Sequence, residues 1–160
     1  MRVIVFFVTV FFWISPNLVL GETLKDLVQR DGLFFPKFKE IPFTGTVEGE
    51  ESGKVLNGLR HGFWRIFYSD GQLESQGNYK NGIKYGKWIG YHQNGVVRYE
   101  GEYLNGEQHG SWTHHWENQV LGFQGAFING KKHGKWVGYE RDGTLADHLT
   151  GFFENGKKVK

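Results

Sequence analysis

Polar and apolar positions alternate in three stretches of the chain, and each stretch has a glycine at the same place. The alternating positions are Leu73, Ser75, Gly77, Tyr79; Val97, Tyr99, Gly101, Tyr103; and Leu121, Phe123, Gly125, Phe127. A period of two predicts β-strands with one buried face, because successive side chains of a strand point to opposite sides of the sheet. A glycine inside a strand indicates a bend or the close approach of another group.

A longer period connects these stretches. The phrase Asn-Gly-x-x-x-Gly-x-Trp begins at Asn57 and returns three times, always 24 residues further on. With its Asn as position one, glycine recurs at position six and tryptophan at position eight: Gly62, Gly86, Gly110, Gly134, Trp64, Trp88, Trp112 and Trp136. Repeat units bury their core by stacking on neighbours and need the same residues each time. We therefore interpret these residues as structural anchors, and we expect the mid-strand glycine to make room for the tryptophan of a neighbouring strand.

Turn signals divide each copy in two. Positions fourteen and fifteen carry Asp-Gly or Asn-Gly in three copies, beginning at Asp70, Asn94 and Asp142, whereas the third copy has Gln119 in place of the glycine. This pair predicts a two-residue hairpin turn with positive φ at both residues. The Asn-Gly-x-x-x-Gly phrase predicts a loop between copies, whose glycines supply backbone angles that other residues resist. Each copy is thus predicted to be one β-hairpin.

The fold class predicted is an all-β repeat protein built from hairpins of about 24 residues. Partial copies at Gly53 and Gly151 extend the repeat array over residues 53–160, the second after a two-residue insertion. Residues 22–52 are expected to form an N-terminal hairpin or cap, with a turn at Asp31-Gly32. A short helix over residues 24–28 is the alternative for that segment.

The first 21 residues are set apart as a secretory signal peptide. Arg2 precedes an apolar run of 12 residues, and Val19 and Gly21 occupy the small-residue positions of a cleavage site. An uncleaved anchor is the alternative, but the run is shorter than the roughly 20 residues that span a bilayer. We therefore expect export to the periplasm or the extracellular space.

Composition narrows the function classes. Of 160 residues, 39% are hydrophobic, 17% are aromatic and 24 are glycine, which favours a β protein with many tight turns. Without Arg2, 18 basic residues face 17 acidic ones, so no basic excess suggests nucleic-acid binding. The chain has no cysteine. An exported protein of this kind is held together by burial and backbone pairing rather than by disulfides.

These motifs resemble the variant (type 2) MORN repeat, named from "membrane occupation and recognition nexus". The resemblance covers about residues 24–160, since "RDG" at Arg30 and "PFTG" at Pro42 resemble the N-terminal part of secreted bacterial proteins with such repeats. It implies a curled antiparallel β-meander with an aromatic-lined groove. Chains of this kind often carry the label antitoxin-family, which no residue here supports.

Catalytic and metal chemistry find little support in the sequence. His61, His109 and His133 recur at position five, where equivalent residues lie about 10 Å apart, too far to share one ion. No nucleophile motif is present, and we interpret Glu100, Glu102, Glu117 and Glu140 as solvated side chains rather than a glycosidase pair. The lysines near the C-terminus are interpreted as solvated turn residues. We expect no enzyme activity, no cofactor and no metal.

The expected function is a non-enzymatic scaffold for protein–protein interaction. The predicted contact residues are the aromatic and histidine side chains that vary between copies: Tyr68, Tyr91, His114, His115, Trp116 and Tyr139. Binding of envelope glycans or lipid headgroups is the alternative, and a toxin-neutralising role is a further one. Trp116, in the most divergent copy, is predicted to contact the partner, so that its loss would weaken binding and leave the fold largely intact. The alternative is that it fills the space left by the missing turn glycine. The partner itself is unknown.

Overall fold

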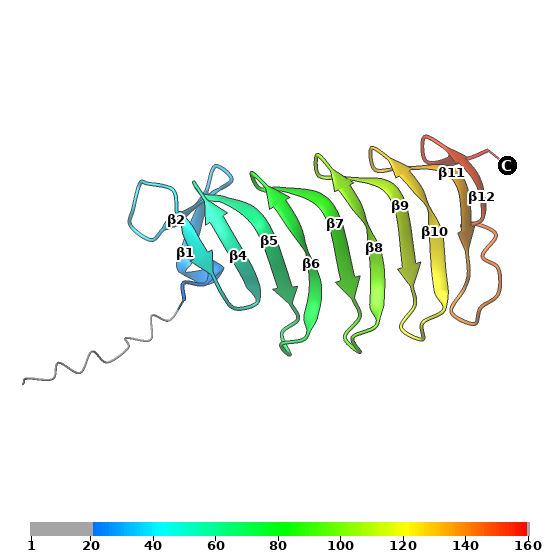
Figure 1. Ribbon diagram of the computed structural model, residues 1–160, viewed down its shortest axis with the longest axis horizontal. Helices are drawn as coiled ribbons and strands as arrows, with labels where there is room; N and C mark the ends of the chain where they lie inside the picture. Colours follow the sequence, from blue (N-terminus) through cyan, green and yellow to red (C-terminus); the bar gives the residue numbers. More distant parts are fainter. Residues whose placement is uncertain (1–20, 160) are drawn as a thin grey trace, which may run out of the picture.

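The computed structural model describes residues 21–159, and it contains one long antiparallel sheet (Figure 1). Eleven strands follow one another in sequence order from β3 to β13, and β1 and β2 form a separate hairpin. The elements are η1 Leu24–Asp26, β1 Leu27–Arg30, β2 Leu33–Pro36, β3 Gly45–Val47, β4 Glu51–Leu56, β5 Leu59–Phe67, β6 Leu73–Lys80, β7 Ile83–Tyr91, β8 Val97–Leu104, β9 Glu107–His115, β10 Leu121–Ile128, β11 Lys131–Gly138, β12 Gly151–Glu154 and β13 Lys157–Lys158. The predicted all-β meander is confirmed, and the sheet is not closed.

The Asn-Gly pairs form the tight turns of the sheet, which corrects the prediction of a longer loop there. Asn57 has φ 49° and Gly58 has φ 79°, and β4 ends and β5 begins at the adjacent residues. Both central residues thus have the positive φ of a two-residue type I′ turn. The same angles recur at Asn81, Asn105, Asn129 and Asn155.

The Asp-Gly and Asn-Gly pairs at positions fourteen and fifteen form a different turn from the one predicted. Gly71 has φ 86°, but Asp70 is not in the positive-φ region. The loop comprises residues 69–71 and is closed by a hydrogen bond from Tyr68 N to Gln72 O, the three-residue hairpin that ends in a left-handed residue. Asp70 Oδ1 accepts a hydrogen bond from Gln72 N. In the third copy Gln119 adopts the left-handed conformation itself, with φ 68°.

The glycine at position six places the tryptophan. Gly62 has φ 69° and lies in β5 where the pairing with β4 changes register, so that Lys54 pairs with His61 and Gly53 pairs with Trp64. Such a bulge frees ladder groups from pairing. The Trp64 Nε1–H donates to Lys54 O at 3.1 Å, and the other three copies make the equivalent bond. A buried indole N–H is thereby satisfied in every copy.

The mid-strand glycines lie directly against these tryptophans, as predicted. A Cβ on Gly101 would approach Trp112 Cδ2 to 2.2 Å, and the corresponding glycines in the other copies are equally close to their tryptophans. Trp64, Trp88 and Trp136 are fully buried, and Trp112 is 2% exposed. The core is thus a row of indoles on one face of the sheet.

The N-terminal segment packs on the first strands of the sheet. Asp31 and Gly32 form the turn between β1 and β2, and both have positive φ. Of the short helix considered for residues 24–28, only the 3-10 turn η1 is present. Leu27 joins a core cluster with Val47, Val55 and Trp64.

At the other end, Trp136 pairs with Gly151 although two residues are inserted before β12. Ala146, within that insertion, is buried. The last partial copy therefore keeps the register of the copies before it. None of the helices among residues 21–159 has the length and apolar character needed to cross a membrane.

Candidate functional site

Eight aromatic rings form a continuous row along one face of the sheet, which we call the ring ladder. The tryptophans at position eight alternate with the aromatic residues at position twenty-three. The members in order are Trp64, Tyr79, Trp88, Tyr103, Trp112, Phe127, Trp136 and Phe153. Neighbouring centroids lie 4.9–6.2 Å apart at interplanar angles of 66–87°. Edge-to-face pairs of this kind contribute about 0.5–1.5 kcal/mol each beyond area burial.

A row of polar side chains at position four covers the ring ladder on its solvent side. Lys84 Nζ lies 4.0 Å from the ring centroid of Trp88, and Lys132 Nζ lies 4.5 Å from that of Trp136. Arg60 covers Trp64 in the same way at 5.1 Å. The third copy has Gln108 at this position, so the row is basic except at one step.

The backbone of the position-four row is fixed by the next copy. The carbonyl of Lys84 accepts a hydrogen bond from the turn glycine Gly106, and those of Arg60, Gln108 and Lys132 accept from equivalent glycines. Burial lowers the pKa of both Lys84 and Lys132. Both ammonium groups are held partly out of water over an aromatic ring. The negative face of the ring attracts such a cation.

Next to the ladder, the middle copies form a second aromatic group. The His114 ring stacks on Phe123 at 4.9 Å and 10°, and the Tyr99 ring stacks on Trp112 at 5.8 Å and 27°. Burial is the main cause that lowers the pKa of His114 to about 4, with the nearby His92 and Arg98 acting in the same direction. His114 is therefore a neutral ring at physiological pH.

Position twelve links each copy to the next by one hydrogen bond from a side chain. Tyr68 Oη donates to Tyr91 O at 2.7 Å, and Trp116 Nε1 donates to Tyr139 O at 2.9 Å. His92 Nε2 makes the same bond to the carbonyl of His115 at 2.8 Å. The Trp116 ring also meets His114 edge to face at 5.1 Å. Of the six residues predicted to bind, Tyr68 and Trp116 thus have their polar atoms engaged between copies.

The other predicted contact residues are divided between the two faces. His114 lies on the ladder face, whereas the position-eleven side chains Tyr91, His115 and Tyr139 project from the opposite face, because neighbouring strand residues alternate. Tyr91 Oη accepts a hydrogen bond from Gln76 Nε2 at 2.9 Å. The six residues therefore do not form one surface. The sequence analysis missed position four, although Arg60, Lys84 and Lys132 recur at the same period of 24 residues.

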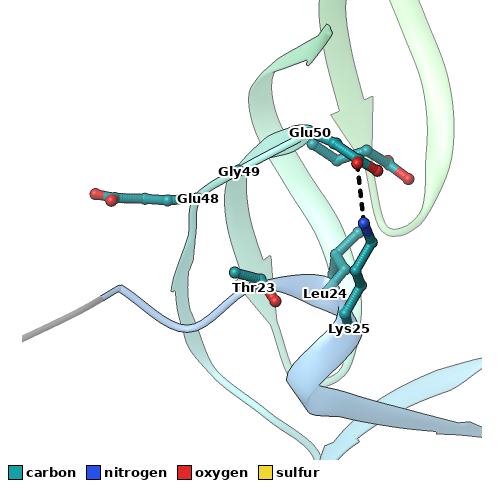
Figure 2. Close-up of a pocket in the computed structure, with 7 residues that line it drawn as sticks. Thr23, Leu24, Lys25, Glu48, Gly49 and Glu50 are labelled. Atoms are coloured by element: carbon teal, nitrogen blue, oxygen red, sulfur yellow. Dashed lines mark hydrogen bonds and ion pairs between the residues drawn. The ribbon is translucent and has the colours of Figure 1, made fainter. Parts of the chain in front are cut away.

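A shallow cavity of about 320 Å³ lies at the N-terminal end of the sheet (Figure 2). Its wall includes Thr23, Lys25 and Glu50, and Lys25 Nζ reaches Glu50 Oε1 at 2.9 Å. Glu48 points away from this pair (Figure 2). Thr23 is engaged with Asp26 through its backbone N–H and its hydroxyl. Lys25 and the Thr23 hydroxyl are thus already engaged in bonds to neighbouring carboxylates.

Several charged groups elsewhere form separate close pairs. Lys87 Nζ pairs with Glu100 Oε2 at 3.2 Å, and Glu117 and Glu140 lie near His92 and His148 at 3.9 and 3.8 Å. Over residues 21–159, no three histidine or carboxylate side chains come together as metal ligands would.

Comparison with known proteins identifies part of the array. The family described as MORN repeat variant matches residues 60–81 and 84–105. Each matched unit begins at a position-four residue, contains two strands with the three-residue loop between them, and ends at a tight turn. No curated protein matches the chain. Proteins with such repeats are typically non-catalytic and generally serve as binding scaffolds. Residues 60–105 thus form two MORN repeats of the variant type, within a sheet of β-hairpins that continues on both sides.

Proposed function

We propose that the chain is a non-enzymatic scaffold that binds a protein partner outside the cytoplasm, and that the ladder face is its binding surface. The observation that carries the proposal is the continuous ring ladder. The N-terminal segment packs against its first rings, and long polar side chains cover the later tryptophans Trp88 and Trp136 on their solvent side. Tyr99, Tyr103 and Phe123 are half-buried there, so part of each ring meets solvent. Tyrosine, tryptophan and arginine dominate the energetics of protein interfaces.

Rigidity supports the proposal. Each ring of the ladder is held by its neighbours, and every tryptophan is hydrogen-bonded to a backbone carbonyl. Side chains that are already ordered lose little conformational entropy when a partner binds. A surface built in this way presents aromatic contact area at low entropic cost.

The predicted contact residues take different roles in this proposal. His114 belongs to the surface because it stacks on Phe123. Trp116 borders the surface, and its bond to Tyr139 O makes it a link between copies as well. The opposite-face residues Tyr91, His115 and Tyr139 are outside the proposed surface. The apolar run in residues 1–21, which lie almost entirely outside the described residues, supports a location outside the cytoplasm.

Site-specific photo-crosslinking tests the proposal. A photoreactive benzoylphenylalanine replaces Tyr103 on the ladder face or Ile89 on the opposite face, both half-buried strand positions. After irradiation of the cells that naturally make the chain, we expect a protease-sensitive adduct with the probe at Tyr103 and none with the probe at Ile89. Equal adducts at the two positions, or none at Tyr103, would contradict the ladder face as the binding surface.

A further inference from the structure

Two cations of the position-four row make no ion pair among residues 21–159. Arg60 pairs with Glu51 at 2.7 Å, and Arg98, further along the same face, lies 3.9 Å from Glu74. Lys84 and Lys132 make no ion pair within the part of the chain that the structure describes. The Glu74 carboxylate favours the charged form of Lys84 from beyond ion-pair distance, and burial alone shifts the pKa of Lys132. Both ammonium groups can therefore still accept a carboxylate at ion-pair distance.

Both lysines are half-buried, so their charged groups lose part of their hydration without gaining an ion-pair partner. Removing a charge from water is unfavourable unless the charge is paired. The rings beneath Lys84 and Lys132 offset part of this cost through the attraction between a cation and an aromatic face. A carboxylate brought by a ligand would offset the rest, and the lowered pKa of each lysine agrees with this incomplete compensation.

The distance between the two lysines limits the ligand. Lys84 lies on β7 and Lys132 on β11, and four strand spacings separate these elements along the sheet (Figure 1). At about 4.8 Å per strand the separation is about 19 Å, and an extended peptide covers it with about six residues at 3.3 Å each. Gln108, on β9, lies midway in the row and offers an amide in place of a third charge.

We propose that the ladder face binds an extended acidic peptide segment of its partner, with one carboxylate at Lys84 and a second, about six residues further on, at Lys132. The proposal rests on the proposed function and adds the chemistry of the partner. Residues six apart in an extended segment share one face of it, so both carboxylates can point to the sheet at once.

A peptide fits these observations better than a sugar chain or a membrane. Sugar rings stack on free aromatic faces, whereas the ladder rings pack edge to face and carry the lysines on top. The ammonium groups lie down on the rings, 4.0 and 4.5 Å from the tryptophan centroids, and do not project to a flat lipid surface. A carboxylate on a flexible side chain can reach into such a position.

Selection from a library of random peptides of about nine residues, long enough for the proposed spacing, tests the inference. Three forms of the folded protein are compared: the unchanged chain, the double variant Lys84→Met and Lys132→Met, and the control Lys87→Met and Lys135→Met. Methionine keeps the apolar stem and removes the charge. The control lysines are exposed and each immediately precedes a ladder tryptophan in its strand, so they lie on the opposite face and lose the same net charge.

We expect the unchanged chain and the control to enrich peptides with two acidic residues six apart. The double variant should lose this enrichment and bind the selected peptides at least about tenfold more weakly. Enrichment that persists in the double variant overturns the inference. Peptides that bind the ladder face without paired acids also overturn it, while leaving the proposed function intact.

Two further probes address the other sources of negative charge. Polygalacturonate and vesicles that contain phosphatidylglycerol are measured against the same three proteins. Lysine-dependent binding of either probe, without any enriched peptide, would show that the anion is not peptidic and would overturn the inference. Failure of the proposed function is recognised separately, as the absence of a protein adduct at Tyr103.

Discussion

Gly77 lies directly against the indole of Trp88, and a Cβ built on Gly77 would come within 2.3 Å of Trp88 Cδ2. The two residues pair across β6 and β7, as Gly53 and Trp64 do across β4 and β5. The same close approach joins Gly101 to Trp112 and Gly125 to Trp136. The spacing of the repeat is therefore set by a glycine and a tryptophan that occupy complementary space.

The variant Gly77→Ala should be destabilised by about 1–3 kcal/mol, because an added methyl group must displace a fully buried indole. Chemical denaturation of the variant and the unchanged chain measures the difference. Asn78→Ala is the control, since Asn78 is the exposed neighbour on the opposite face. Equal stability of Gly77→Ala and the unchanged chain would show that the indole has room to move.

Removal of the Trp88 ring should lower the free energy of unfolding more than the methyl group added in Gly77→Ala. Trp88→Ala loses a fully buried side chain, its hydrogen bond to Asn78 O and its edge contacts with Tyr79 and Tyr103. A loss of about 3–5 kcal/mol is expected for such a deletion. The melting temperature should fall far more than in Lys157→Ala, an exposed control; similar melting temperatures would contradict an anchoring role.

Trp116→Ala is expected to lower stability by about 1–3 kcal/mol, since it leaves Tyr139 O without its donor and removes a ring from His114. The sequence offered two outcomes for this variant, a loss of binding or a loss of stability, and these contacts favour the second. A melt followed by circular dichroism separates the two. A melting temperature equal to that of the unchanged chain would show that Trp116 does not stabilise the fold and would leave it as a contact residue only.

Acid should weaken the fold through His114. Its pKa falls from 6.5 to about 4 on folding, so between these values the unfolded chain binds a proton that the folded chain does not. The contribution of the neutral ring is fully present above pH 6.5 and is lost as the pH falls towards 4. His114→Phe keeps a ring on Phe123 and removes the titration.

The measurement is the drop in melting temperature between about pH 7.5 and about pH 4.5. The drop should be smaller in His114→Phe than in the unchanged chain, and His148→Gln, at an exposed position, should leave it unchanged. An equal drop in all three proteins would mean that folding does not lower the pKa of His114.

Export is a prediction from the sequence, and residues 1–20 lie outside the described structure. The described fold begins just after the predicted cleavage site, where Glu22 O accepts a hydrogen bond from Glu48 N at 2.9 Å. Cleavage before Glu22 therefore leaves every described strand intact. N-terminal sequencing of the exported protein should start near Glu22, and an intact Met1 in a soluble cytoplasmic pool would contradict export.

The sequence by itself determined the repeat, its period and its packing partners. The glycine and tryptophan positions, such as Gly101 and Trp112, are visible because the same residues return in every copy. The alternation of apolar and polar residues between them predicts strands with one buried face. The turn at Asp31-Gly32 was also predictable, since positive φ at two adjacent residues is a local preference.

Only the tertiary structure decided which pair makes the tight turn and which side chains remain free. Asp70-Gly71 and Asn57-Gly58 look alike in sequence, but the choice between a two-residue and a three-residue turn depends on which residues pair beside it. The bond from Trp116 to Tyr139 O and the position of Lys84 over Trp88 were likewise decided only by the tertiary structure, because these contacts depend on where strands lie relative to one another rather than on the preference of any one residue.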